Sequence, residues 1–298
     1  MTNYNQINKY HTIFLFLLSL SFLILKIDFQ EKNVAIVCFF LIATIGISHG
    51  SLDNFKGAKL LKILNIKNKL LFYFIYISVS FVVICSWLIF SLFTLTVFLI
   101  VAAYHFGKED SVYGKINRFK LLNLLLFLKG SLIILAPLYF HQYETIQIFE
   151  ILGVKLTQYN INLIIVLISL SLISNFFINK NILLSLLDSF TVIILNINFE
   201  PLLAFTIYFC FLHSIRHSLS LIQDINSKNL NKGLISFLKK ALPLTIVTVF
   251  GFLMAVFLLN EYYLLDSAIL KVVFIGLASL TFPHILLEYL LEKNEKQT

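Results

Sequence analysis

The chain has 298 residues, of which 59% are apolar and 13% are charged, and its formal net charge is +8. Its mean hydropathy is +0.91, whereas soluble domains average about 45–50% apolar and about 25% charged residues. This composition excludes an ordinary soluble globule, a disordered chain, a collagen and a soluble nucleic-acid-binding protein. Since a membrane-crossing helix needs about 20 apolar residues, we expect an all-α, polytopic integral membrane bundle of about ten transmembrane helices.

Ten apolar runs follow one another along the chain, and each predicts a transmembrane helix. They cover residues 11–26, 34–50, 69–89, 91–107, 119–140, 161–179, 181–197, 200–222, 239–259 and 266–290. The first run has no strongly basic start and no A-x-A-like cleavage site, so we interpret it as a retained crossing rather than a signal peptide. No repeat or linker divides the chain, which predicts a single integral membrane domain over residues 1–298.

Proline and cysteine fit this organisation. The four prolines, Pro137, Pro201, Pro243 and Pro283, lie near the ends of predicted helices, as expected where backbone groups must be satisfied internally. Cys38, Cys85 and Cys210 all lie inside apolar runs. They therefore predict buried free thiols and no disulfide framework.

The basic residues are distributed unevenly between the connectors. Seventeen Lys and Arg residues lie in one set of alternate connectors, and only Lys26, Lys32 and Lys155 lie in the other set. By the positive-inside rule, both termini face the cytoplasm and the number of crossings is even. This agrees with ten crossings and predicts a multi-pass protein of the cell inner membrane, whose positive charge serves topology and not nucleic-acid binding.

Five of the seven histidines lie in, or at the ends of, apolar runs. With the predicted orientation they all fall at a similar depth near the cytoplasmic side: His49, His105, His213, His217 and His284. Polar side chains inside a bilayer are costly, so each needs a partner or a purpose. The common depth therefore predicts one shared site.

The motif HSIRH places His213 and His217 four residues apart. Residues at this spacing share one face of a helix, one turn apart, so both imidazoles can bind the same metal ion. The pair alone is equally typical of hydrogen-bonded core histidines. Together with His49 and His105 at matching depth it predicts a metal site, and imidazole donors suit iron, copper, zinc or nickel.

Acidic residues accompany the histidines in HGSLD (49–53), HFGKED (105–110) and PHILLE (283–288): they are Asp53, Glu109, Asp110 and Glu288. A carboxylate that accepts the second N–H of a ligating imidazole fixes its tautomer and raises its basicity. Alternatively, these acids mark solvated helix ends. Arg216, between the paired histidines, is predicted to pair with Asp53 or Asp110 in a structural role.

Other polar residues in the apolar runs give weaker indications of function. We predict a buried ion pair between Lys129 and Asp188. A Schiff-base lysine that binds retinal, as in a rhodopsin, fits poorly because Lys129 lies in the fifth of ten predicted helices. Tyr104, directly before His105, is the aromatic residue that we predict in a substrate pocket.

Four ordered motifs resemble those of a known family. HGSLD at 49–53, YHFGKED at 104–110, HSIRH at 213–217 and PHILL at 283–287 are similar to the motifs of the Brp/Blh family of bacterial and archaeal membrane proteins, the β-carotene 15,15'-dioxygenases. The motifs run from the second predicted helix to the last. Asn54 is one departure, because the family often has a second histidine there, as HGxxDH.

The resemblance implies iron-dependent cleavage of the central double bond of β-carotene by oxygen to give two molecules of all-trans-retinal. It implies Fe(2+) bound by His49, His105, His213 and His217, with His284 as a further motif histidine. The retinal is expected to supply a microbial rhodopsin, and the bilayer to dissolve the substrate.

Two other classes of membrane protein also place several histidines within their membrane helices. A di-iron desaturase or hydroxylase usually has eight or more histidines in HxxxH and HxxHH boxes, whereas this chain has seven in total. A metal or proton transporter is expected to show broken helices or internal repeats, which the sequence does not indicate. The number of metal ions per chain, or transport without retinal formation, would separate these classes.

Overall fold

The computed structural model describes residues 2–26, 33–112, 121–156, 160–227 and 229–295, without the side chains of residues 2–4 and 49. Within these ranges every regular element is a helix, which confirms the predicted all-α class. The elements are α1 (Thr2–Leu25), α2 (Val34–Leu41), η1 (Ile42–Gly46), η2 (Ser48–Leu52), α3 (Asp53–Ile63), α4 (Leu70–Ile89), α5 (Ser91–Glu109), α6 (Leu122–Phe140), α7 (Gln142–Ile151), α8 (Ile161–Ile178), α9 (Ile182–Asn198), α10 (Pro201–Ile207), η3 (Tyr208–Ser214), α11 (Ile215–Ile225), α12 (Leu230–Leu259) and α13 (Leu265–Glu295).

Nine helical segments of the described residues are long and apolar enough to cross a membrane, by length and composition. They are Asn5–Leu25, Val34–Ile63, α4, α5, α6, α8, Pro201–Ile225, α12 and α13. The seventh predicted crossing is α9, an apolar helix of 17 residues, which at 1.5 Å per residue spans about 26 Å. A polytopic helical architecture is therefore present, and ten crossings with cytoplasmic termini remain predictions.

Local chemistry explains where neighbouring helices separate. The side chain of Asn181 accepts a hydrogen bond from the backbone N–H of Leu184 and so begins α9, because an N-cap oxygen satisfies a donor that the first turn leaves open. Between α4 and α5, Phe90 leaves helical geometry at φ −131° and ψ 59°. The predicted boundaries at residues 89–91 and 179–181 are therefore breaks between separate helices.

Several helices are longer than their apolar runs predicted, and in two of them this changes the position of a proline. α12 begins at Leu230 and α13 continues to Glu295, so Pro243 and Pro283 lie inside helices and not near their ends. Proline removes one backbone hydrogen bond, a loss that neighbouring helices make good in membrane proteins. Of the other two prolines, Pro201 is in the first turn of α10 and Pro137 lies in the last turn of α6.

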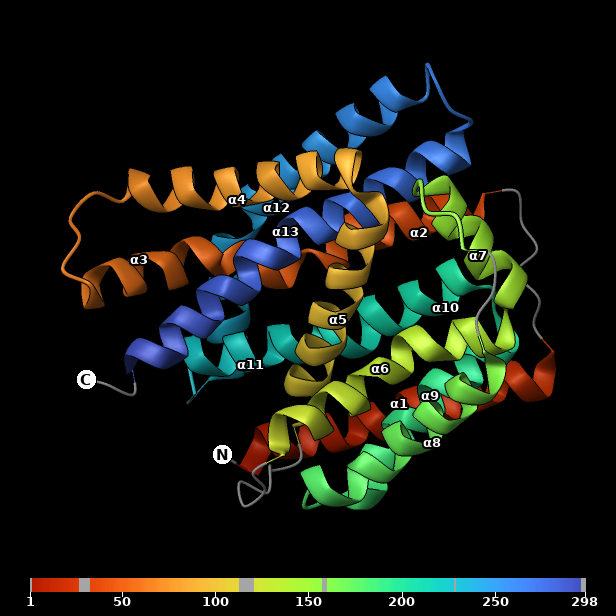
Figure 1. Ribbon diagram of the computed structural model, residues 1–298. Helices are drawn as coiled ribbons and strands as arrows, with labels where there is room; N and C mark the ends of the chain where they lie inside the picture. Colours follow the sequence, from red (N-terminus) through yellow and green to blue (C-terminus); the bar gives the residue numbers. More distant parts are fainter. Residues whose placement is uncertain (1, 27–32, 113–120, 157–159, 228, 296–298) are drawn as a thin grey trace.

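The helices form a bundle in which α13 is central and packs against α3, α4, α5 and α12 (Figure 1). α5 and α6 approach each other closely, because Gly107 and Gly130 carry no side chain where the two backbones meet. Small residues allow such close approach in membrane bundles. Cys38 and Cys210 are buried, Cys85 is half-buried, and all three are free thiols, as predicted.

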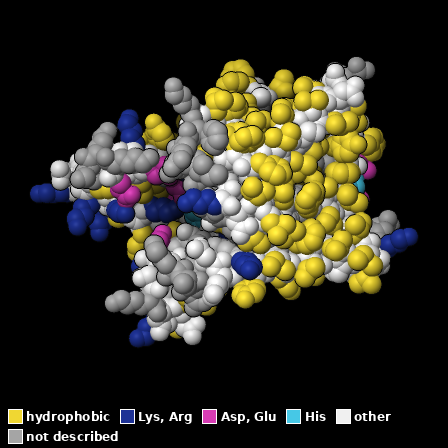
Figure 2. All heavy atoms as spheres, turned by 90° about the horizontal axis from the view of Figure 1, so that it is seen from below, with side chains coloured by type: hydrophobic (Ala, Val, Ile, Leu, Met, Phe, Trp, Pro, Cys, Tyr) yellow, Lys and Arg dark blue, Asp and Glu magenta, His cyan; other side chains and the backbone are white. Residues whose placement is uncertain are grey.

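Hydrophobic and charged side chains separate on the surface. Figure 2 shows hydrophobic side chains over most of one face, with most charged groups at one end. Three ion pairs hold α3 and α5 to the end of α13: Lys56–Glu288 at 2.7 Å, Lys59–Glu295 at 2.5 Å and Lys108–Glu292 at 2.5 Å. This polar end borders the histidine-bearing segments.

Candidate functional site

Four of the five predicted histidines lie together inside the bundle. His105 comes from α5, His213 from η3, His217 from α11 and His284 from α13, and all four are buried. The ring centroids are 5.3 Å apart for His105 and His213, 5.5 Å for His105 and His284, and 5.9 Å for His217 and His284. Residues far apart in the sequence therefore form one cluster, which we call the histidine cluster.

The side chain of His49 is outside the description, but its backbone lies in the tight helical turn η2. The next residue, Gly50, borders the cluster: a Cβ atom there would lie 4.0 Å from Nδ1 of His284. The turn that carries position 49 therefore reaches the histidine cluster.

Two π-helical turns, which the sequence did not predict, shape this region. η1 and η3 contact each other, and the Ser214 hydroxyl donates to the carbonyl of Gly46 at 2.9 Å. A Cβ at Gly46 would lie 2.6 Å from the ring of Phe209, so only glycine permits this approach. Single π-turns within helices are frequent at functional sites, and η3 positions His213 at the end of such a turn.

Three histidines each have a carboxylate at Nδ1. The distances are 3.0 Å from His213 to Asp110, 3.3 Å from His217 to Glu109 and 2.9 Å from His284 to Asp53. Each carboxylate comes from a different segment than the histidine that it contacts: Glu109 and Asp110 lie at the C-terminal end of α5, and Asp53 begins α3. Because a carboxylate accepts the Nδ1–H, a metal would bind these rings through Nε2.

Two tyrosines, also not predicted, support these carboxylates. Tyr208 donates to Oδ2 of Asp110 at 2.5 Å, and Tyr76 donates to Oδ2 of Asp53 at 2.9 Å. The site thus contains two Tyr–Asp–His chains. Burial alone would raise the pKa of the Asp110 carboxyl, but His213, Arg216 and the hydrogen bonds outweigh it and hold that pKa below its ordinary value. These contacts therefore favour the charged form of Asp110 as the acceptor.

Glu288 lies closer to the cluster than a solvated helix end would. Its Oε1 is 3.6 Å from Nε2 of His284 and 3.9 Å from Nε2 of His217, and it accepts from Lys56 at 2.7 Å. One donor atom each from His105, His284 and Glu288 lie within 4.8 Å of one another. Two imidazoles and one carboxylate form a donor set typical of non-haem iron sites. The spacing HxxxE on one helix is the sequence signal that marks Glu288.

The ion pairs behind the cluster differ from the prediction. Both oxygens of Asp188 accept from Arg216, at 2.7 Å each, and Arg216 also donates to Thr12 at 2.5 Å. The predicted partners of Arg216, Asp53 and Asp110, are instead bound to histidines and tyrosines. Asp188, the predicted partner of Lys129, thus forms its ion pair with Arg216. Lys129 donates to the backbone carbonyl of Asp110 and to the hydroxyl of Ser111, at 3.2 Å each.

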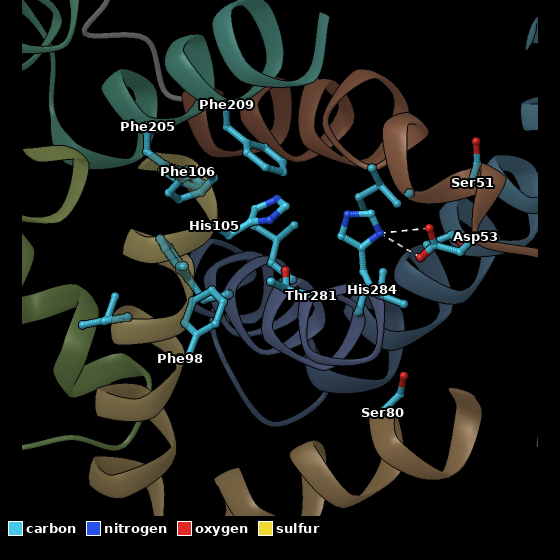
Figure 3. A pocket seen from close by; sticks show the side chains of 18 of the residues that line it. Ser51, Asp53, Ser80, Phe98, His105, Phe106, Phe205, Phe209, Thr281 and His284 are labelled. Carbon is cyan, nitrogen blue, oxygen red and sulfur yellow. Dashed lines mark hydrogen bonds and ion pairs between the residues drawn. The ribbon is translucent and has the colours of Figure 1, made fainter. Parts of the chain in front are cut away.

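An apolar cavity of about 430 Å³ borders the histidine cluster. His105 and His284 form part of its wall, with Phe98, Phe106, Phe205 and Phe209 around His105 and with Asp53 behind His284 (Figure 3). Tyr104 is not among the lining residues, and its hydroxyl donates to Asn123 on α6 at 3.4 Å. Consecutive helix residues point about 100° apart, so the neighbour of an inward-facing His105 faces another direction. Asn54, where the family often has a second histidine, lines the cavity.

The chain was compared with known families, curated proteins and solved structures. No curated protein and no solved structure is significantly similar to it. The family model described as Beta-carotene 15,15'-dioxygenase matches residues 40–292. This match includes the histidine cluster, its carboxylates and every helix that lines the cavity. The chain therefore belongs to the beta-carotene 15,15'-dioxygenase family.

Proposed function

We propose that this protein cleaves the central 15,15' double bond of β-carotene with molecular oxygen and releases two molecules of all-trans-retinal. The observation that carries the proposal is a buried histidine cluster, with rings oriented by carboxylates, bordering an apolar cavity in a chain of this family. In the overall reaction, each carbon of the broken double bond receives one oxygen atom. The retinal would then be available to a microbial rhodopsin.

The cluster suits iron(II). With metal–nitrogen bonds of about 2.1 Å, the centroids of two imidazoles on one metal ion lie on the order of 5 Å apart, and the observed separations are 5.3–5.9 Å. The proposed ligands remain His49, His105, His213 and His217. His284 and Glu288 add two donors in the same place, and imidazole with carboxylate favours iron over magnesium or calcium. Bound iron(II) would supply the oxygen activation that protein side chains lack.

The residues of the chain would orient the metal ligands and enclose the substrate. Asp110, Glu109 and Asp53 accept the Nδ1–H of their histidines, which fixes the tautomer and directs Nε2 toward the metal position. The phenyl rings along the cavity exclude water and allow the polyene to lie in van der Waals contact. Because no acid or base needs to act on a hydrocarbon, catalysis depends on holding one double bond at the cluster.

Retinal formation by the purified protein tests this proposal. With iron(II), oxygen and β-carotene, chromatography should show retinal as the sole aldehyde, and longer or shorter apocarotenals would contradict central cleavage. Metal analysis should give one iron per chain, whereas two would favour a di-iron desaturase. Transport in liposomes without retinal would favour a transporter.

Histidine variants test the ligand set. His213→Ala and His217→Ala should each lose both iron and cleavage, because each removes a donor from the cluster. His141→Ala is the matched control, since His141 lies next to a helix end and contacts the carbonyl of Asn196 at 2.8 Å. Full activity in His213→Ala or His217→Ala would remove that residue from the ligand set.

A further inference from the structure

The cavity extends well beyond the histidine cluster. Along α13 its wall runs from Phe274 to His284, which at 1.5 Å per residue is about 15 Å. Among its lining residues, all of them described, two are exposed: Tyr73 at 42% and Ile77 at 65%. Both belong to α4, so the cavity reaches the molecular surface along this helix.

The other side of this opening is formed by α12. Leu244, Thr245 and Thr248 line the cavity and are half-buried, while the adjacent Val247 is 66% exposed. α4 and α12 both pack against α13 but make little contact with each other, and both contribute side chains to the cavity wall. They are also the least buried candidate spans, with 11% of each apolar window inside the protein.

The serine and threonine hydroxyls near this opening bond within their own helices. Ser80 donates to the carbonyl of Tyr76, Thr245 to that of Ala241 and Thr248 to that of Leu244. These hydroxyls are therefore satisfied within their own helices. The threonines can present methyl groups, and a hydrocarbon can pass without leaving a buried donor open.

We propose that the cavity opens to the bilayer between α4 and α12, and that the polyene substrate enters the site through this opening. The inference rests on the proposed function for the identity of the substrate. A hydrocarbon with no polar group is dissolved in lipid and not in water, so a lateral route avoids an aqueous step. Ser80, Thr281 and His284 in Figure 3 mark the passage from α4 to the cluster.

A bulky side chain at the rim tests the route. Thr248→Trp should lower the rate of retinal formation from β-carotene in proteoliposomes at least tenfold, with unchanged iron content. Val247→Trp, one position away on the same helix but facing lipid, should stay within twofold of wild type. Equal rates for the two variants, whether both slow or both normal, would overturn the proposal.

Reversible labelling of the opening excludes misfolding as the cause of lost activity. In a Cys85→Ser background, Thr248→Cys labelled with a bulky thiol reagent should lose activity and regain it on reduction, while labelled Val247→Cys should not change. Activity that persists after complete labelling of Thr248→Cys would refute the route.

A binding readout separates this inference from the proposed function. Iron-depleted protein is mixed with carotene-loaded vesicles for set times, and the β-carotene that it retains is measured after affinity capture. Wild type should take up carotene at least tenfold faster than Thr248→Trp. Uptake with this difference but no cleavage by the iron-loaded protein would refute the proposed function and leave the route standing. If wild type takes up no carotene, or both take it up equally, the route is wrong.

Discussion

Asp53→Asn is expected to weaken iron binding by about 10- to 100-fold, the usual effect of losing a hydrogen-bond acceptor behind a metal ligand. Asp53 is buried, and both of its oxygens lie 2.9 Å from Nδ1 of His284 while Oδ2 also accepts from Tyr76. Asn preserves the shape but offers one acceptor where two donors point. One buried donor is then unsatisfied, which costs about 1–3 kcal/mol. Since a tenfold change in affinity corresponds to about 1.4 kcal/mol, this cost agrees with a tenfold to hundredfold loss of iron affinity.

The structure also predicts an order among related variants. Tyr76→Phe removes one donor but leaves the carboxylate on His284, so iron affinity should fall only several-fold. Glu292→Gln breaks the half-exposed pair with Lys108, which contributes at most about 1 kcal/mol to stability, and should not change iron affinity.

The assay is anaerobic titration of the detergent-purified protein with iron(II) against a competing chelator, with retinal formation measured in parallel. If Asp53→Asn binds iron within twofold of wild type, His284 is not oriented for the metal by Asp53. If Glu292→Gln weakens iron binding as strongly as Asp53→Asn, the effect is a general one of surface charge. Either result would refute the reasoning.

Three further variants test packing, charge and the cavity. Gly107→Ala should destabilise the protein by about 1–3 kcal/mol or more in denaturation assays, because its Cβ would overlap the carbonyl of Leu126. Gly251→Ala, with no neighbouring atom within 4 Å, should be neutral or stabilise the protein by up to about 1 kcal/mol. Equal effects of the two substitutions would contradict this account. Asp188→Asn leaves Arg216 without its carboxylate in the interior and should cost about 3–5 kcal/mol in the same assay, and an unchanged midpoint would show that the pair is not structural. Ala102→Phe projects into the cavity and should abolish retinal formation with normal iron content, so lost iron or retained activity would contradict its placement.

The fold could be predicted because hydropathy reports directly on membrane helices. Each of the ten apolar runs corresponds to a helix or to a continuous helical segment. The errors lie where helices continue into polar surroundings. α13 extends to Glu295 because ion pairs with α3 and α5 stabilise its last turns, and a hydropathy pattern contains no information about such pairs.

The site could be predicted as a set of residues but not as a set of contacts. A common depth placed His105, His213, His217 and His284 in one cluster, because helices of known direction fix the height of each residue. Height does not fix which faces of two helices meet. The pairing of carboxylates with histidines depends on those faces, so the sequence could not show which acid supports which histidine.

The same reasoning explains why Tyr76 and Tyr208 were missed. Their roles depend on Asp53 and Asp110, and each tyrosine lies on a different helix from its aspartate. In a chain with thirteen tyrosines, nothing in the local sequence separates these two from lipid-facing or core rings. Only the packing of α4 beside α3, and of η3 near the end of α5, gives them a partner.

The charges around the cluster explain why these acids are kept inside the bundle. Asp53, Glu109, Asp110 and Glu288 bring four formal negative charges to one region, and Lys56 offsets one of them. Buried charge is costly unless it is compensated. A divalent cation held by neutral imidazoles would balance most of the remainder without protonating the rings that must bind it. Acids that orient the histidines would thus also neutralise the metal, and both roles require the positions that the crossing helices give them.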